Sequence, residues 1–354
     1  MLKRNIRLLI ISMDKIINYN DKINDKIKKY CDFENIQGYS LITKESSNIL
    51  NIDNENMQYI FNFEKVNNIR RVNKFHEIVN KKLNNGNIYL SCGETLESRR
   101  ARIRNKVPIG FKTILRIIDF FYKRVLPKLP IIRKFYFFAT QGHNRVMSKP
   151  EILGRLISCG FEILEYFEIE GLLYVISKKD KDPEFNMDPS YGPIFKMNRI
   201  GYKGKIIKVY KIRTMYPYSE YCQKLIMDEN NLSDSGKFFN DYRVTTWGKI
   251  FRKFWIDEIP MFINFFKGEL NLIGVRPLSE KYFSTYPEHL QKLRIKVKPG
   301  LIPPYYADLP ENFDAILNSE EEYLNQKLKS PIRTDIKYFF KAMINIFLKG
   351  ARSH

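Results

Sequence analysis

The clearest pattern of hydrophobic and polar positions lies between residues 148 and 160 of the chain. Apolar residues recur there at helical spacing, Ser148 stands at the expected N-cap, and Glu151 occupies the capping-box position. Pro150 fits the first turn of a helix, and Gly160 fits its end. The segment therefore predicts a helix that begins after Ser148 and ends at Gly160.

Two runs with strand-like alternation follow this helix, at residues 161–166 and 172–177. They are joined by a Glu-Gly pair, which predicts a β-hairpin, and a further short strand is predicted at residues 87–91. A helix followed by such a hairpin is how many methyltransferase-like Rossmann domains end. No Gly-x-Gly-x-Gly loop follows a strand, so a working S-adenosylmethionine site is not expected. We interpret residues 1–178 as a Rossmann-like accessory domain of unknown role.

Residues 111–138 combine apolar and aromatic positions at helical spacing with seven Lys or Arg residues. Pro127 and Pro130 interrupt the pattern. A basic, aromatic, broken amphipathic segment suits a membrane interface. A pair of surface helices packed on a core explains the pattern equally well, so both interpretations stay open.

A charged linker that contains proline is predicted at residues 179–190, and a second domain at 191–354. The strand expected at residues 206–212 delivers Lys211 and Arg213 on the same face, because side chains two positions apart point the same way. Two cations on one face suit a diphosphate. A solvated basic strand is the commoner explanation for such a pair.

Asp257 and Glu258 are adjacent carboxylates in an apolar, aromatic setting. A helix is predicted from about Thr246, with Arg252 five residues before the acid pair, and Pro260 is expected to kink or end it and to aim the pair outward. Neighbouring carboxylates in such a setting are costly unless cations or a metal pair with them. They can also divide labour, one acting as a nucleophile while the other holds Mg²⁺. A structural ion pair is the competing interpretation.

A further cation is expected on a tight turn that follows a hydrophobic strand. The turn reads Gly-Val-Arg-Pro at residues 274–277, and it presents Arg276. A guanidinium on such a turn is a plausible clamp for a phosphate group.

The net charge of +21 favours an anionic partner: nucleic acid, anionic lipid headgroups or phosphorylated substrates. No nucleic-acid-binding motif is found, so nucleic acid is not the expected partner. The four cysteines form no Cys-x-x-Cys pair, which favours a reducing compartment. No uncharged apolar run of about 18 residues occurs, so the chain is expected in the cytoplasm or on a membrane that it does not cross.

The order of motifs between about residues 190 and 350 resembles the bacterial sugar transferase family, the monotopic phosphoglycosyl transferases that begin the assembly of bacterial surface glycans. The motifs that carry the resemblance follow one another in the order and at the spacing of the family. They read Gly192 to Phe195, Arg199-Ile200-Gly201, Lys211-Ile212-Arg213-Thr214-Met215, Asp241-Tyr242-Arg243 with Thr245, Gly248 and Arg252, Ile256 to Met261, Gly268 to Pro277, and Lys298-Pro299-Gly300. A closing helix from about residue 334 also fits the family.

The resemblance implies a reaction and roles for the site residues. Asp257 would attack the β-phosphate of a UDP-sugar, release UMP and form a phosphosugar–aspartyl intermediate. A polyprenyl phosphate, undecaprenyl phosphate in the family, would then accept the phosphosugar. Glu258 would bind Mg²⁺, and phosphates would be held by Arg252, Lys211, Arg213 and Arg276. The expected location is the cytoplasmic face of the bacterial inner membrane, peripheral or monotopic, against an anionic lipid surface.

Several departures from the family pattern accompany the match. The family's membrane-inserted helix before the Gly-Pro start is replaced by a hydrophilic linker and a different domain. Met261, Val275 and Leu278 stand where the family commonly has Gln, Pro and an acid. A non-catalytic or regulatory scaffold of a polysaccharide assembly complex is therefore the alternative function. The sugar, the glycan and the oligomeric state, including a homo-oligomer, are left open. The expected fold class is α/β: a Rossmann-like domain, then a compact helix-rich α/β domain with a short sheet.

Overall fold

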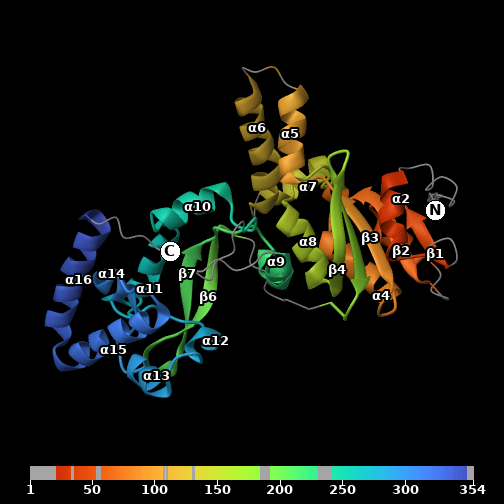
Figure 1. Cartoon of the computed structure of the whole chain (residues 1–354). Helices are drawn as coiled ribbons and strands as arrows, with labels where there is room; N and C mark the ends of the chain where they lie inside the picture. The colour runs from red at the N-terminus through yellow and green to blue at the C-terminus, as the bar shows by residue number, and fades with distance from the viewer. Residues whose placement is uncertain are drawn as a thin grey trace. The chain divides into compact units, whose positions relative to one another are not determined.

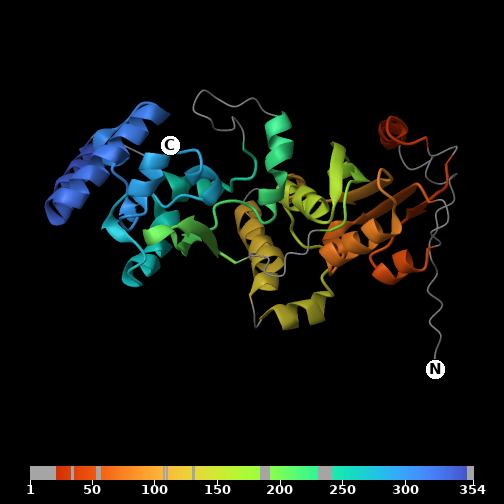
Figure 2. The same ribbon diagram turned by 90° about the horizontal axis from the view of Figure 1, so that it is seen from below.

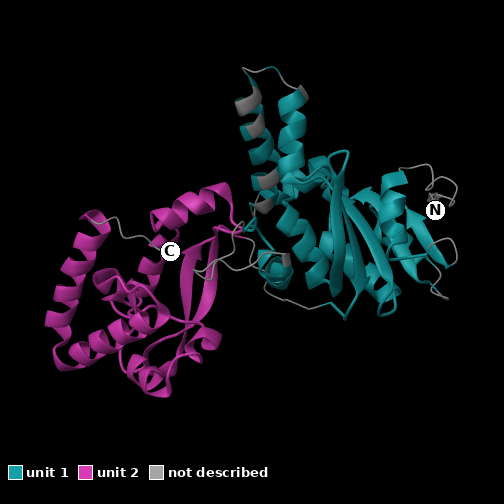
Figure 3. Ribbon diagram, viewed as in Figure 1, with its two compact units in different colours: residues 1–189, 216–243 teal, residues 190–215, 244–354 magenta. Residues whose placement is uncertain are grey.

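The computed structural model describes residues 21–32, 36–52, 57–106, 108, 111–129, 132–183, 192–229 and 241–348. The chain divides into two compact units (Figure 3). Unit 1 comprises Met1–Pro189 and Tyr216–Arg243, and unit 2 comprises Ser190–Met215 and Val244–His354. Most of the segment predicted as a linker, residues 184–190, lies outside the described residues.

Unit 1 is built on a five-stranded sheet with the order β1-β2-β3-β5-β4 (Figure 1). β1, β2 and β3 pair in parallel, β5 pairs antiparallel with β3, and β4 pairs antiparallel with β5. The strands are β1 (Gly38–Leu41), β2 (Tyr59–Lys65), β3 (Ile88–Gly93), β4 (Phe161–Ile169) and β5 (Leu172–Lys179). The described helices of the unit are α2 (Asp21–Lys28), α3 (Ser46–Leu50), α4 (Val72–Lys82), α5 (Leu96–Lys106), α6 (Lys112–Phe120), α7 (Ile132–Thr140), α8 (Lys149–Ser158) and α9 (Gln223–Glu229), with the short turns η1 (Val66–Asn68), η3 (Phe121–Val125), η4 (Leu126–Lys128) and η6 (Ser219–Cys222).

The central strands of unit 1 are buried on both faces, as expected for a sheet with helices on both sides. In β2, Ile60 packs in the core shared with α4 and α8, whereas Phe61 packs on the opposite face with α2. In β3, Tyr89 and Leu90 divide between the two faces in the same way. The mixed α/β architecture predicted for the N-terminal domain is confirmed.

The pattern between residues 148 and 177 folds as expected. Ser148 accepts a hydrogen bond from the Glu151 backbone N–H at 3.4 Å and so caps α8. β4 and β5 form the predicted antiparallel hairpin, and Glu170 and Gly171 turn the chain with positive φ angles of 52° and 75°. These local predictions succeed because the capping residues and the turn residues lie beside the elements they delimit.

The segment 111–138 forms α6, η3, η4 and α7, and α6 runs beside α5 away from the sheet (Figure 1). Arg99 on α5 holds α6 through two hydrogen bonds of 2.7 Å to the Asp119 carboxylate. Much of the segment's apolar surface stays uncovered, including Phe135 and Phe138, which are 74% and 87% exposed. The break near Pro127 and the amphipathic character are thus as predicted.

Unit 2 combines short strands with a larger number of helices. β6 (Ile194–Ile200) and β7 (Ile206–Ile212) form an antiparallel hairpin, and β8 (Asn271–Ile273) pairs in parallel with β9 (Gly300–Ile302). The helices are η5 (Tyr202–Gly204), α10 (Thr246–Lys253), η7 (Ile256–Met261), α11 (Phe262–Phe266), α12 (Glu280–Phe283), α13 (Glu288–Arg294), α14 (Tyr305–Asp308), α15 (Phe313–Lys329) and α16 (Pro331–Leu348). The helix-rich domain with a short sheet is the expected one.

The core of unit 2 lies between β8, α13 to α16 and the loops that join them. α16 buries one face there through Tyr338 and Ala342 and lies at the outside of the unit in both views (Figures 1 and 2). Across the residues described, no helix is both long enough and apolar enough to cross a membrane.

Candidate active site

The acid pair lies on η7, directly after a sharp change of direction in the chain. Thr245 caps α10 by accepting a hydrogen bond from the Gly248 N–H at 2.8 Å, and the helix ends at Lys253. Trp255 then adopts a left-handed conformation with φ of 54°, which starts the 3₁₀ turn that carries the two acids. The helix therefore breaks at Trp255, before the acids, and not at Pro260 as the sequence suggested.

Asp257 is largely removed from water, with 8% of its surface exposed. Burial raises the pKa of its carboxyl group, the nearby positive charges of Lys211 and Arg252 lower it, and the charge of Glu258 raises it; the balance is a raised pKa. The outward aim expected of the pair does not hold for Asp257. Its carboxylate is instead inside the domain, where cations rather than water offset its charge.

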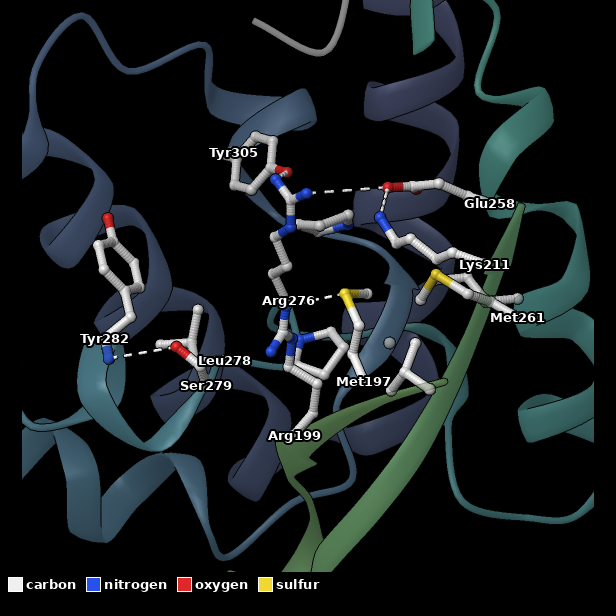
Figure 4. Close-up of a pocket in the computed structure, with 15 residues that line it drawn as sticks. Met197, Arg199, Lys211, Glu258, Met261, Arg276, Leu278, Ser279, Tyr282 and Tyr305 are labelled. Carbon is white, nitrogen blue, oxygen red and sulfur yellow. Dashed lines mark hydrogen bonds and ion pairs between the residues drawn. The ribbon is translucent and has the colours of Figure 1, made fainter. Parts of the chain in front are cut away.

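Glu258 faces a pocket and is held there by two cations. Its Oε1 accepts a hydrogen bond from the Lys211 Nζ at 2.5 Å and lies 3.8 Å from the Arg276 guanidinium (Figure 4). These contacts join β7, η7 and the turn after β8, which are far apart in the sequence. The structure thus brings together three of the six residues predicted for the site.

Arg252 and Arg213 occupy different positions from these three. The Arg252 Nε donates a hydrogen bond to the Thr214 hydroxyl at 2.9 Å, so its guanidinium is tied to the chain just beyond the end of β7, and its charge acts on Asp257. The Arg213 Nε donates to the Gly192 carbonyl oxygen at 3.1 Å, and its guanidinium lies over the Phe195 ring. The structure does not place Arg213 on the pocket with Lys211, because β7 ends between them.

The pocket has a volume of about 300 Å³ and gathers side chains from five parts of unit 2 (Figure 4). It is lined by Met197, Arg199, Val209, Lys211, Glu258, Met261, Arg276, Pro277, Leu278, Ser279, Tyr282, Gly300, Leu301, Pro303 and Tyr305. Three cations face one carboxylate in this lining, so the pocket carries a net positive charge. Such a cavity suits an anionic ligand with several oxygens.

Arg199 is a member of the pocket that the sequence reasoning did not assign to the site. Its pKa is lowered by burial and by the like charge of Arg276, so the two guanidiniums face a common space. An anion between them would relieve this repulsion. The Arg-x-Gly motif of the family resemblance was the available signal, but a half-buried position on β6 is visible only in the fold.

Tyr305 is a second member that the sequence did not reveal. Its hydroxyl accepts a hydrogen bond from the Arg276 Nη1 at 3.3 Å, which orients the guanidinium toward Glu258. Burial raises the pKa of Tyr305, so the hydroxyl remains protonated near neutral pH and can donate to a bound anion.

The three residues that depart from the family pattern pack in hydrophobic clusters of unit 2. Val275 and Leu278 are buried in the core of unit 2, 1% and 6% exposed, and Met261 packs against Val209 while touching the pocket. The chain around Arg276 is thus anchored by apolar contacts. Leu278 lines the pocket where the family commonly has an acid, so this change leaves the pocket with one carboxylate fewer than the family pattern.

The residues present fit a magnesium ion that arrives with a phosphorylated substrate. In the described parts of the chain, no group of three or more His, Cys, Asp or Glu side chains could hold a metal. Mg²⁺ commonly binds one or two carboxylates together with substrate phosphates, and Glu258 supplies one carboxylate at the pocket. Lys211 would have to release Glu258 to an incoming ion.

Comparison with known proteins gives the family of this part of the chain. Residues 186–349 match the family model described as bacterial sugar transferase, which confirms the resemblance seen in the motifs. The chain is 37% identical over 144 residues to the galactosyl transferase CpsE of Streptococcus agalactiae, covering 38% of this chain and 31% of that protein.

Two further relatives match shorter stretches. The chain is 38% identical over 107 residues to an uncharacterized sugar transferase, EpsL, of Bacillus subtilis, covering 30% of this chain and 46% of the relative. It is 36% identical over 115 residues to the UDP-glucose:undecaprenyl-phosphate glucose-1-phosphate transferase of Escherichia coli, covering 32% and 23%. The matches thus span from about a quarter to about a half of these relatives' own length.

Proposed function

From the premise that residues 186–349 form a bacterial sugar transferase domain, we propose that this protein transfers a sugar phosphate from a UDP-sugar to a polyprenyl phosphate. The reaction would serve the synthesis of a bacterial surface polysaccharide or glycoconjugate. The names of relatives support both substrates, since one of them acts on UDP-glucose and undecaprenyl phosphate.

One observation carries the proposal: the acid pair lies at a cationic pocket. One carboxylate of the pair is buried next to the pocket, and the other faces into it. Asp257 is 8% exposed, and Glu258 contacts Lys211 and Arg276 across the pocket. Phosphoryl transfer needs positive groups around the phosphate oxygens and a nucleophile in line with the leaving group. A cationic pocket beside an acid pair supplies both kinds of group.

In the first step, a carboxylate oxygen of Asp257 attacks the β-phosphorus of the UDP-sugar. The bond between that phosphorus and the bridging oxygen breaks, and UMP leaves with the electron pair. Lys211, Arg276 and Arg199 hold the phosphate oxygens, while Arg252 stabilises the ionised form of Asp257. In the second step, a phosphate oxygen of the acceptor attacks the same phosphorus and releases Asp257.

Glu258 is the residue that would hold Mg²⁺ together with the substrate phosphates. When bound, the ion would neutralise part of the negative charge on the phosphate oxygens. Lys211, freed from Glu258, would then turn its ammonium group to the phosphate oxygens.

We place the protein against an anionic membrane surface. The exposed face of α16 is an apolar stripe at helical spacing, formed by Ile332, Ile336, Phe340, Ile344, Phe347 and Leu348. Residues 111–138 expose a second apolar surface, and their single acid, Asp119, is paired with Arg99. Apolar surface flanked by cations suits the interface of an anionic bilayer.

The test is release of UMP by the purified full chain from a panel of UDP-sugars, with polyprenyl phosphate and Mg²⁺. We expect release that depends on the acceptor, and exchange of labelled UMP into the UDP-sugar without the acceptor. Asp257→Asn should abolish both reactions, since no carboxylate remains to form the intermediate.

Folded protein that releases no UMP with any sugar of a broad panel would contradict the proposal. Release of UMP without exchange would support transfer but rule out the covalent intermediate. Chelation of Mg²⁺ should stop both reactions, and activity that survives it would remove the metal from the scheme.

A further inference from the structure

A second cavity of unit 2 lies beside the cationic pocket and has a different character. It has a volume of about 570 Å³ and is formed by the end of α10, η7, α11, β8, β9, α14 and the end of α16. Its lining is Phe254, Trp255, Glu258, Ile259, Phe262, Leu272, Leu301, Ile302, Tyr306, Met343, Ile346 and Phe347. Among these side chains, Glu258 is the only carboxylate, and none is cationic.

The polar groups of this apolar pocket are largely satisfied within the protein. The indole N–H of Trp255 donates to the Tyr306 hydroxyl at 2.8 Å, and the two rings meet edge to face. A peptide bound there would leave its backbone amides without partners, which is costly in an apolar site. The lining therefore favours a hydrocarbon over a peptide or a sugar.

The two pockets meet at the acid pair. Glu258 and Leu301 line both of them, and Asp257 directly precedes Glu258 on η7. A molecule with one anionic end and one apolar end could place its charge among Lys211 and Arg276 and its chain in the apolar pocket. The nucleotide-sugar has no apolar end, so it does not suit this second cavity.

Large apolar side chains at the rim of the apolar pocket are exposed to solvent, as expected of a binding surface. Ile259 and Phe347 are 56% and 78% exposed, and Phe254 and Phe262 are about half exposed beside them. Soluble proteins rarely leave large apolar side chains gathered at one cavity unless something binds there. The volume and the apolar lining with one polar end match those of small-molecule sites.

We propose that the apolar pocket holds the first isoprene units of the acceptor, with the acceptor phosphate at the Asp257–Glu258 end. The inference rests on the proposed function and adds a binding site for the chain. The hydrocarbon would thus be held by protein side chains next to the chemistry, and the acceptor phosphate would be positioned for attack. The specificity of the pocket for a hydrocarbon chain would come from apolar contact with Ile259, Phe262 and Phe347.

The activity test uses soluble acceptors, so that no bilayer contributes. Full-length protein is assayed with farnesyl phosphate, below its micelle concentration, and with dimethylallyl phosphate. We expect kcat/KM to be at least about tenfold higher for farnesyl phosphate, because the longer chain buries more apolar surface. In Phe347→Asn and Ile259→Asn this ratio should fall to within about threefold, while UMP exchange stays close to wild type.

The matched control is Ile332→Asn, which makes the same change at a similarly exposed position of α16 that does not line the pocket. It should keep the wild-type ratio. If the wild type catalyses UMP exchange but shows no preference for farnesyl phosphate, the inference is overturned and the proposed function still stands. The same holds if the preference survives in Phe347→Asn. Absence of exchange and transfer in folded wild type would overturn both.

A second measurement does not depend on turnover. Trp255 lines the pocket, and replacing the exposed Trp247 by Phe makes Trp255 the sole tryptophan of the chain. Farnesyl phosphate should change the Trp255 fluorescence at saturable concentrations, and Phe347→Asn should weaken this binding about tenfold. An unchanged Trp255 signal, or equal binding by inorganic phosphate, would contradict a site for the chain.

Discussion

Asp257 shows at the scale of one residue how function and stability oppose each other. Burial raises the pKa of its carboxyl group, so the folded state disfavours the ionised form at neutral pH. The burial of Asp257 therefore lowers the free energy of unfolding. This loss of stability is fully present at pH values above the raised pKa, and it disappears once the pH is low enough to protonate the group in both folded and unfolded chains.

Replacing Asp257 by Asn removes the proposed nucleophile, so the rate of UMP exchange should fall by a factor on the order of 10³ or more. The Tm at pH 7 should stay the same or rise, because an ionised group is removed from a buried place. The gain over wild type should shrink as the pH falls toward 4. Melting curves of both proteins at several pH values measure this, and a large loss of Tm at pH 7 would show a structural role for the carboxylate.

The cations of the domain separate into those that line the pocket and those that do not. Arg199 lines it, whereas Arg213 is tied to the Gly192 carbonyl outside it. Arg199→Met should raise the KM for the UDP-sugar about tenfold or more, as expected for loss of a charge-assisted hydrogen bond to phosphate.

Arg213→Met is the matched variant and should change this KM less than about threefold. Initial-rate kinetics over a range of UDP-sugar concentrations distinguish the two. An equal effect of both substitutions would support the interpretation of Lys211 and Arg213 as a pair on one strand face.

At the scale of elements, two glycines allow β8 and β9 to approach beneath the pocket. A Cβ atom built on Gly300 would lie 2.2 Å from the Gly274 nitrogen, which no side chain can tolerate without moving the backbone. This close pairing positions the turn that carries Arg276 next to the Lys-Pro-Gly motif.

Gly300→Ala should lower the free energy of unfolding of unit 2 by about 1–3 kcal/mol, as overpacking does in tight cores. Gly192→Ala is the control, because its new Cβ would meet only one atom at an ordinary 3.6 Å. Urea unfolding followed by Trp fluorescence reports on unit 2, where both tryptophans lie. Equal stability of the two variants would show that the strands separate easily.

The helical segment 111–138 raises a separate question of membrane contact. Replacing Phe135 and Phe138 together by Glu should reduce co-sedimentation with anionic vesicles by several-fold, since both rings are exposed on a basic segment. Leu50→Glu introduces a charge at an exposed apolar site elsewhere in unit 1 and should leave binding unchanged. Binding that is insensitive to the double substitution would exclude this segment as the contact.

At the scale of the whole molecule, the chain crosses between the two units more often than the sequence suggests. After β7 it enters unit 1, where the Tyr218 hydroxyl accepts a hydrogen bond from Asn73 at 2.6 Å, and it returns at Val244. Cys222 and Ile226 of this segment are fully buried in the core of unit 1. Residues 216–243 therefore depend on unit 1 for their packing.

A fragment of residues 190–354 should leave Cys222 open to solvent. This is the only cysteine of that fragment, and in the full chain its Sγ lies 3.5 Å from the Pro150 carbonyl oxygen. A thiol reagent should modify it at least about tenfold faster in the fragment than in the full chain, because burial limits access. Protection of Cys222 in the fragment would mean that the segment folds without unit 1.

Sequence alone determined the features that depend on neighbouring residues. The capped helix α8, the hairpin of β4 and β5, the strand before Arg213 and the helix before the acid pair are specified by local caps, turns and periodicity. The ordered motifs also identified the family of residues 186–349, since they mark positions along the chain.

Tertiary structure decided which of those residues meet. Lys211, Glu258 and Arg276 come together, Arg199 and Tyr305 join them, and Arg213 stays outside. No spacing along the chain encodes these distances, because they arise from the packing of β6, β7 and η7 against the paired strands β8 and β9. The burial of Asp257 and the apolar pocket beside it follow from the same packing, which forms only when the whole domain folds.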